Sequence, residues 1–99
     1  MQYVVGDMPL LQVTVTDVDD GSVVDLTGAT ATLRWSIEGA AATTGSMTIT
    51  DATNGVCQRQ WGSGEISGEG TILFEVLVVD SSSNRYTSQQ FKRDIRRAI

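Results

Sequence analysis

Three aspartates in the N-terminal third of the chain could supply the oxygen ligands that a calcium ion prefers. Asp17, Asp19 and Asp20 come just before Gly21 in the sequence. Their spacing does not match the EF-hand loop, in which a glycine and a later glutamate occupy fixed positions. We therefore predict an acidic hairpin tip here, and no metal site.

Two glutamates and a cysteine are the other candidates for acid–base or nucleophilic chemistry. Glu65 and Glu69 could form the carboxylate pair of a glycosidase, but they lie in the glycine-rich stretch 62–70, which offers no rigid support and no lysine for a phosphate. Cys57 has only Arg59 as a nearby cation, so we expect it to pack as a small apolar side chain. With no histidine in the chain, we predict no catalytic residue, no metal and no cofactor.

The two tryptophans could bind a ligand by stacking. Trp35 lies on the apolar face of an alternating segment, so we expect it in the core. Trp61 stands at the end of a predicted strand beside Gly62. Two interpretations stay open for it: a core residue, or an exposed ligand platform that would make the chain a glycan-binding module.

Strands must position all of these residues, because the chain shows strand periodicity and no helical pattern. Apolar residues alternate with polar ones at Leu11–Thr16 and most clearly at Ala29–Glu38. The remaining predicted strands are a short return at Val23–Val24, one marked by Met47 and Ile49, and then Val56–Trp61, Thr71–Asp80, Arg85–Phe91 and Asp94–Ile99. Turn-rich segments, including Asn54-Gly55, separate them, and 62–70 is expected to be a long exposed connection. This pattern predicts an all-β fold: an antiparallel β-sandwich of about seven to eight strands.

Composition is that of one globular domain over residues 1–99. Hydrophobic residues are 40% and charged residues 19% of the chain, with a net charge of −5. The acidic excess argues against nucleic acid as a partner. No apolar run is long enough to cross a membrane, and the start lacks a signal-peptide pattern, so we expect no membrane partner.

The charge is unevenly distributed. Residues 1–80 hold eleven acidic and two basic residues (net −9), whereas residues 81–99 hold five basic residues and one acidic residue (net +4), which together give −5. Complementary charge can orient one protein against another. We predict that the basic end, with Arg93, Arg96 and Arg97, binds a partner; a solvated basic strand face is the alternative.

Two apolar segments could also contact a partner. The predicted strand Thr71–Asp80 is apolar on both sides, so Leu73, Leu77 and Val79 would lie on its outer face, covered by a loop or by another subunit. The segment that begins with Tyr3 could add a strand to a neighbour's sheet edge. It could equally be the first strand of its own domain.

Several sequence segments resemble one known family in the same order along the chain. Gly6-Asp7 precedes the strand Leu10–Thr16, an aspartate-rich turn follows, and Val24–Thr30 reads Val-Asp-Leu-Thr-Gly-Ala-Thr. Later segments continue the match: Thr50–Val56, Trp61-Gly62, Gly68–Thr71 and Phe74–Val76. Together they resemble the N-terminal domain of phage baseplate upper proteins and related small phage virion proteins. Arg59 and Cys57 depart from the family, which often has an aromatic and an apolar residue there.

The resemblance implies an immunoglobulin-like module of a phage particle and not an enzyme. It implies attachment in the tail, baseplate or neck, with other virion proteins (tail, neck or capsid subunits) as partners in a symmetric oligomeric assembly. Capsid decoration is an alternative role. The protein would then be a virion component made in the host cytoplasm, where an unpaired Cys57 is stable.

Overall fold

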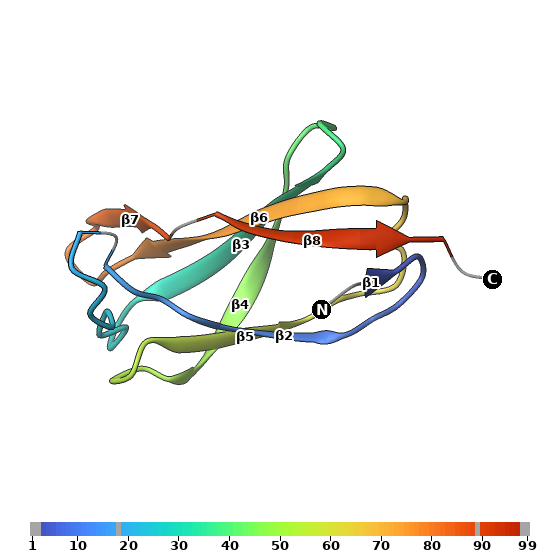
Figure 1. Cartoon of the computed structure of the whole chain (residues 1–99). Coiled ribbons are helices and arrows are strands. Elements are labelled where there is room, and N and C mark those ends of the chain that lie inside the picture. The colour runs from blue at the N-terminus through green and yellow to red at the C-terminus, as the bar shows by residue number, and fades with distance from the viewer. Residues whose placement is uncertain (1–2, 18, 89, 98–99) are drawn as a thin grey trace.

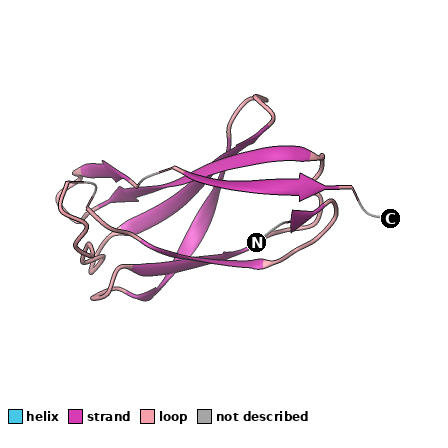
Figure 2. Cartoon of the chain, viewed as in Figure 1, coloured by secondary structure: helices cyan, strands magenta, loops and turns pink. Residues whose placement is uncertain are grey.

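The computed structural model describes residues 3–17, 19–88 and 90–97. These residues form eight strands and no helix (Figures 1 and 2): β1 (Tyr3–Val4), β2 (Leu10–Thr14), β3 (Thr30–Ile37), β4 (Thr43–Asp51), β5 (Val56–Gln60), β6 (Gly70–Val79), β7 (Arg85–Thr87) and β8 (Phe91–Arg96). The predicted all-β fold is confirmed. Within the described residues, no helix could span a membrane.

All eight strands belong to one curled sheet in the order β1-β8-β6-β3-β4-β5-β2, with β7 also paired to β6. Strand β4 makes the curl: its first half pairs with β3 and its second half with β5, with a register shift between Ile49 and Asp51. The β3–β6–β8 part and the β5–β2 part therefore lie in two layers (Figure 1). The prediction of antiparallel pairing is wrong at one place, because β1 runs parallel to β8. The immunoglobulin-like character of this curl stays a prediction.

Alternating side chains from both layers fill the space between them. In β3, Ala31, Leu33 and Trp35 are buried, and in β6 Ile72, Phe74, Val76 and Val78 are buried. Two tryptophans meet at the centre, with the ring of Trp35 edge-on to that of Trp61 at 5.0 Å between centroids. Full burial of one large apolar side chain is worth roughly 1.5–3 kcal/mol, so this core is the main source of stability.

The Asn54-Gly55 turn between β4 and β5 requires its glycine. Gly55 has a φ of 71°, a region that favours glycine. A Cβ atom there would lie 2.7 Å from the Val24 carbonyl oxygen and 2.9 Å from that of Val15. A side chain at this position would therefore collide with the backbone of the first hairpin.

Two sequence predictions about connections are wrong. The stretch 62–70 is not simply exposed, because Ile66 is fully buried and Glu65 forms an ion pair with Arg59. The predicted single strand Arg85–Phe91 is broken: Leu77 pairs with Thr87 but Phe74 pairs with Phe91, so the register along β6 shifts by one extra residue between β7 and β8. Such an extra residue interrupts the ladder, which ends β7 and starts β8.

Candidate partner-binding surface

The outward-pointing residues of β6 form a strip that we call the outer β6 face: Leu73, Glu75, Leu77 and Val79. Leu73 is 39% exposed, whereas Leu77 and Val79 are half-buried. On the side away from β3, β7 flanks Leu77 and Val79, whereas β8 flanks Leu73. The described chain therefore leaves an apolar strip that is most open at Leu73.

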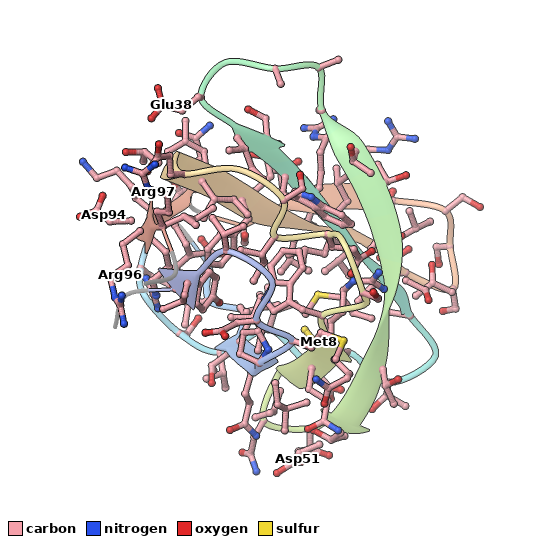
Figure 3. The ribbon with its side chains drawn as sticks, turned by 90° about the vertical axis from the view of Figure 1, so that its right-hand side faces the viewer. Met8, Glu38, Asp51, Asp94, Arg96 and Arg97 are labelled. Atoms are coloured by element: carbon pink, nitrogen blue, oxygen red, sulfur yellow. The ribbon has the colours of Figure 1, made fainter. Side chains whose placement is uncertain are left out.

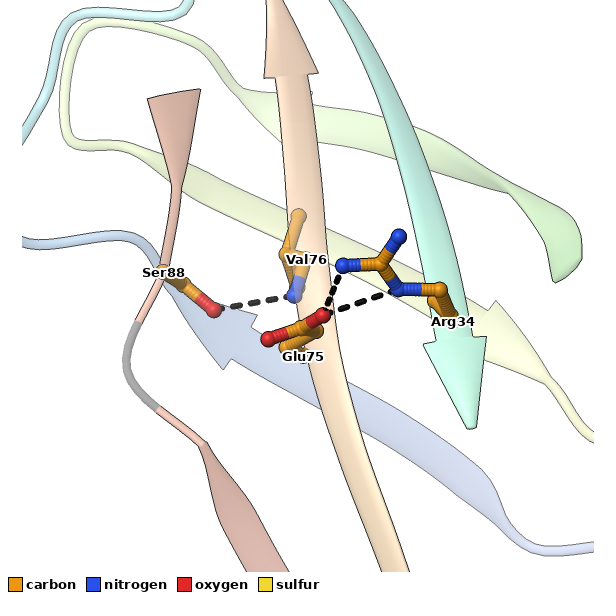
Figure 4. A network of polar contacts seen from close by, with 4 residues as sticks. All are labelled: Arg34, Glu75, Val76 and Ser88. Carbon is orange, nitrogen blue, oxygen red and sulfur yellow. Dashed lines mark hydrogen bonds and ion pairs between the residues drawn. The ribbon is translucent and has the colours of Figure 1, made fainter. Parts of the chain in front are cut away.

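An ion pair lies in the middle of this face. The Arg34 Nε donates to Glu75 Oε1 at 2.8 Å, and Arg34 Nη2 also contacts that oxygen (Figure 4). The Glu75 side chain is 17% exposed and the Arg34 side chain 42%. Beside them, the Ser88 hydroxyl accepts a hydrogen bond from the Val76 N–H at 2.9 Å (Figure 4). The pair neutralises the only acidic side chain of the strip.

A shallow hollow of about 130 Å³ adjoins the same face. Its lining includes Arg34, Leu73, Glu75 and Gln90. It thus joins the exposed end of the apolar strip to the ion pair, and it gives the face a concave point that a partner's side chain could fill.

The three arginines of the basic end do not share one face. Arg93 lies opposite the buried Ile72 in the β6–β8 ladder, and its guanidinium lies 5.7 Å from the centre of the Phe74 ring, so it is half-buried on the inner side. Arg96 follows with the opposite orientation and is exposed, as is Arg97. Figure 3 shows Arg96 and Arg97 on one side of the molecule, away from Met8 and Asp51.

Lys92 is a cation that the sequence reasoning missed. It is exposed and lies directly opposite Leu73 in the β6–β8 ladder. Lys92 therefore borders the apolar strip on the β8 side, whereas Arg93 points inward and Arg96 lies past the end of the β6–β8 ladder, opposite Val4 of β1. The sequence indicated this orientation, because residues an even number of positions apart in a strand, such as Lys92 and Arg96, point to the same face.

Two acidic side chains share the basic end. Thr71 N–H donates to Glu38 Oε1 at 2.6 Å, and its hydroxyl lies 3.5 Å from Asp94 Oδ1. The basic end is therefore a mixed patch and not a uniform field, which makes its charge pattern more specific for a complementary surface.

Tyr3 pairs within its own chain, and its side chain is buried. Its strand β1 pairs with Ile95 and Arg96 of the same chain, and the Tyr3 side chain is 4% exposed. Its hydroxyl lies 3.3 Å from the Trp61 Nε1. The interpretation as the first strand of its own domain is the correct one, and Tyr3 does not form part of the surface.

Trp61 is not an exposed platform, because it is fully buried. Its backbone N–H donates to the Pro9 carbonyl at 3.0 Å, and Tyr3 and Trp35 pack against its ring. Burial of Ile66 shows that the connection after Trp61 folds back over the core. The glycan-binding alternative thereby loses the residue on which it depended.

The remaining chemical candidates have local structural partners. Asp17 accepts a hydrogen bond from the Asp19 N–H at 2.8 Å, and hydrogen bonds from Ser22 lower the pKa of Asp20. No three of the described residues form a group able to hold a metal ion. Burial raises the pKa of the Cys57 thiol to about 11, so it is protonated at neutral pH.

An all-β module with an uncovered apolar strip and bordering charges is suited to binding another protein. The chain matches the model of the BppU N-terminal domain over residues 1–99, so it belongs to this family, the N-terminal domain of phage baseplate upper proteins. It is accordingly a structural protein associated with the phage baseplate, a virion component that interacts with other virion proteins.

No curated protein matches the sequence. Among solved structures, CopC from Methylosinus trichosporium OB3b is similar, with a TM-score of 0.59 at 8% identity over 99% of this chain and 86% of that one. At this identity the likeness concerns the fold alone.

Proposed function

We propose that this domain is a non-enzymatic attachment module of the phage tail, baseplate or neck, and that it docks on another virion protein through the outer β6 face. The observation that carries the proposal is the exposed Leu73 beside Lys92, with no described segment covering either. An apolar centre with charged residues at its border is the usual anatomy of a protein interface.

The charges of this face indicate the kind of partner. Arg34 and Glu75 neutralise each other, which leaves Lys92 as the cation beside Leu73, while the exposed Asp94 follows on the same face of β8. A complementary partner would present an apolar side chain to Leu73 and an acidic side chain to Lys92. Each contact is small, but repeated copies around a symmetric particle make weak binding durable.

Incorporation into particles tests this proposal. Phage carrying Leu73→Asp should incorporate at least about tenfold less of the protein, because a buried unpaired carboxylate opposes docking. Met8→Asp is the matched control, since Met8 is 55% exposed and lies beside Gln60 of β5, in the other layer of the sheet. Quantitative mass spectrometry of purified particles measures the copy number. Equal incorporation of Leu73→Asp and wild type would refute the proposed face.

Immunogold electron microscopy of intact particles tests the location independently. Label confined to the tail, tail tip or neck is expected of an attachment module. Label over the whole head would make it a capsid decoration protein instead. Before assembly, we expect the folded domain to be present in the host cytoplasm with Cys57 as a free thiol.

A further inference from the structure

Strand β2 leaves one of its two edges unpaired among the described residues. It pairs only with β5, and it ends the strand order of the sheet (Figure 1). Proteins usually protect such an edge with charge, proline or a bulge, because it can pair with another strand. The segment Leu10–Thr14 has no charged residue and no proline, and its ladder with β5 runs without a register shift.

The hydrogen bonds at the two ends of the β2–β5 ladder show which backbone groups of β2 point toward β5 and which point toward the open edge. These bonds are Trp61 N–H to the Pro9 carbonyl at 3.0 Å and Val15 N–H to the Gly55 carbonyl at 2.8 Å. Bonded and non-bonded pairs alternate in an antiparallel ladder, so Leu11 and Val13 bond to β5. The backbone groups of Leu10, Gln12 and Thr14 therefore point to the open edge.

We propose that two copies of this chain pair β2 with β2 in antiparallel orientation, about a twofold axis at Gln12. In this register Gln12 lies opposite Gln12 of the second copy, and Leu10 lies opposite Thr14. All three pairs are of the hydrogen-bonded type, because each joins residues whose backbone groups face the open edge. A twofold interface requires this self-complementarity.

Charge supports a second copy as the occupant. The chain carries a net charge of −5, so two copies repel each other overall, and an uncharged contact avoids part of this repulsion. The outward side chains nearest the open edge are uncharged: Leu10, Gln12 and Thr14, and behind them Thr48, Gln58 and Gln60. The one acidic residue of β2, β4 and β5 is Asp51, which lies two strands from the edge. Pairing there brings no acidic side chain of these strands opposite another, and it places a neighbour beside Leu10, which is 58% exposed in the single chain.

This interface is separate from the outer β6 face, which belongs to the other layer of the sheet. One copy can therefore use both surfaces at once, the first toward another virion protein and the second toward an identical neighbour. A twofold pair would present two outer β6 faces to the particle and raise their effective concentration.

Sedimentation equilibrium and amide hydrogen exchange of the whole chain test the inference. We expect a reversible dimer, with the amides of Leu10, Gln12 and Thr14 becoming protected as concentration rises. The amides of Leu11 and Val13 should be protected at every concentration, because they bond within the chain. This alternation distinguishes strand pairing from contact between side chains.

Two substitutions at Gln12 and one control sharpen the test. Gln12→Lys places like charges opposite each other at the axis and should weaken dimerisation about tenfold or more. Gln58→Lys adds the same charge on the same face, directly beside Gln12 but one strand from the edge, and should dimerise almost as wild type does. Gln12→Pro removes the edge-facing N–H without removing a bond to β5, and should abolish the dimer while the domain stays folded by circular dichroism.

Three results would overturn the inference. The first is a monomer at all concentrations up to about 1 mM, the range of effective concentration on a particle. The second is a dimer that Gln12→Lys and Gln12→Pro leave unchanged. The third is a dimer in which the amides of Leu10, Gln12 and Thr14 exchange at one rate throughout; protection of these amides only with another virion protein would assign the edge to that protein instead.

Discussion

Replacing Ile66 by alanine should destabilise the domain strongly, although Ile66 lies in a glycine-rich connection. The side chain is fully buried, and the change removes three carbon atoms. At about 0.8 kcal/mol for each carbon, the lost transfer energy is about 2.4 kcal/mol. The cavity that remains adds to this, so we expect a loss of about 2–5 kcal/mol in the free energy of unfolding. Small domains have a total of only about 5–15 kcal/mol.

Urea denaturation followed by tryptophan fluorescence measures this loss, because Trp35 and Trp61 report directly on the core. The midpoint should fall while the slope with denaturant stays unchanged. Ile66→Val should cost about 0.5–1.5 kcal/mol. Ser67→Ala is the control, since Ser67 is exposed, and it should change stability by less than about 0.5 kcal/mol. A similarly small effect of Ile66→Ala would show that the connection does not pack on the core and would refute the reasoning.

Three further predictions test other parts of the structure. Gly55→Ala should lower the free energy of unfolding by about 1–3 kcal/mol, because Gly55 has a positive φ and a Cβ atom there would lie 2.7 Å from the Val24 carbonyl oxygen. Thermal unfolding measures this loss. An unchanged stability would contradict the turn geometry. Arg59 and Glu65 approach to 2.6 Å, so a double-mutant cycle of Arg59→Met and Glu65→Gln should give a coupling of about 0.5–3 kcal/mol, whereas additive effects would argue against the ion pair. The pKa of Cys57 is raised from 9.0 to about 11, so the contribution of its neutral thiol to stability is fully present below pH 9.0 and is lost as the pH rises through about 11. Cys57→Ala should lack this part of the pH dependence of the free energy of unfolding. If the variant and the wild type showed the same pH dependence, the result would contradict the pKa shift.

Local patterns in the sequence correctly predicted the strands whose side chains alternate. The alternation of Ala31, Leu33 and Trp35 placed β3 and its buried face, and Asn54-Gly55 placed the turn between β4 and β5. These features depend on neighbours in the chain, because side-chain period and turn conformation are local properties of the backbone. The similarity along the chain was also sufficient to predict the baseplate upper protein family, which the family match confirms.

The sequence predicted less about the connections, where a single side chain decides the structure. The stretch 62–70 is rich in glycine, and its composition indicated an exposed loop, yet Ile66 anchors it in the core. One apolar residue gives no periodic signal. Its burial depends on a space between the layers that exists only after β3, β5 and β6 have packed.

The sequence by itself determined that this protein is all-β, that Leu73 points outward from a long strand, and that positive charge gathers at the C-terminal end. Only the tertiary structure decided which of these residues lie together. It paired β1 with β8, which buries Tyr3 beside Trp61, and it separated Arg93 from Arg96 while placing Lys92 opposite Leu73. Period-two alternation fixes which residues share a face of one strand, but the partner strand and its register come from long-range packing of the whole core.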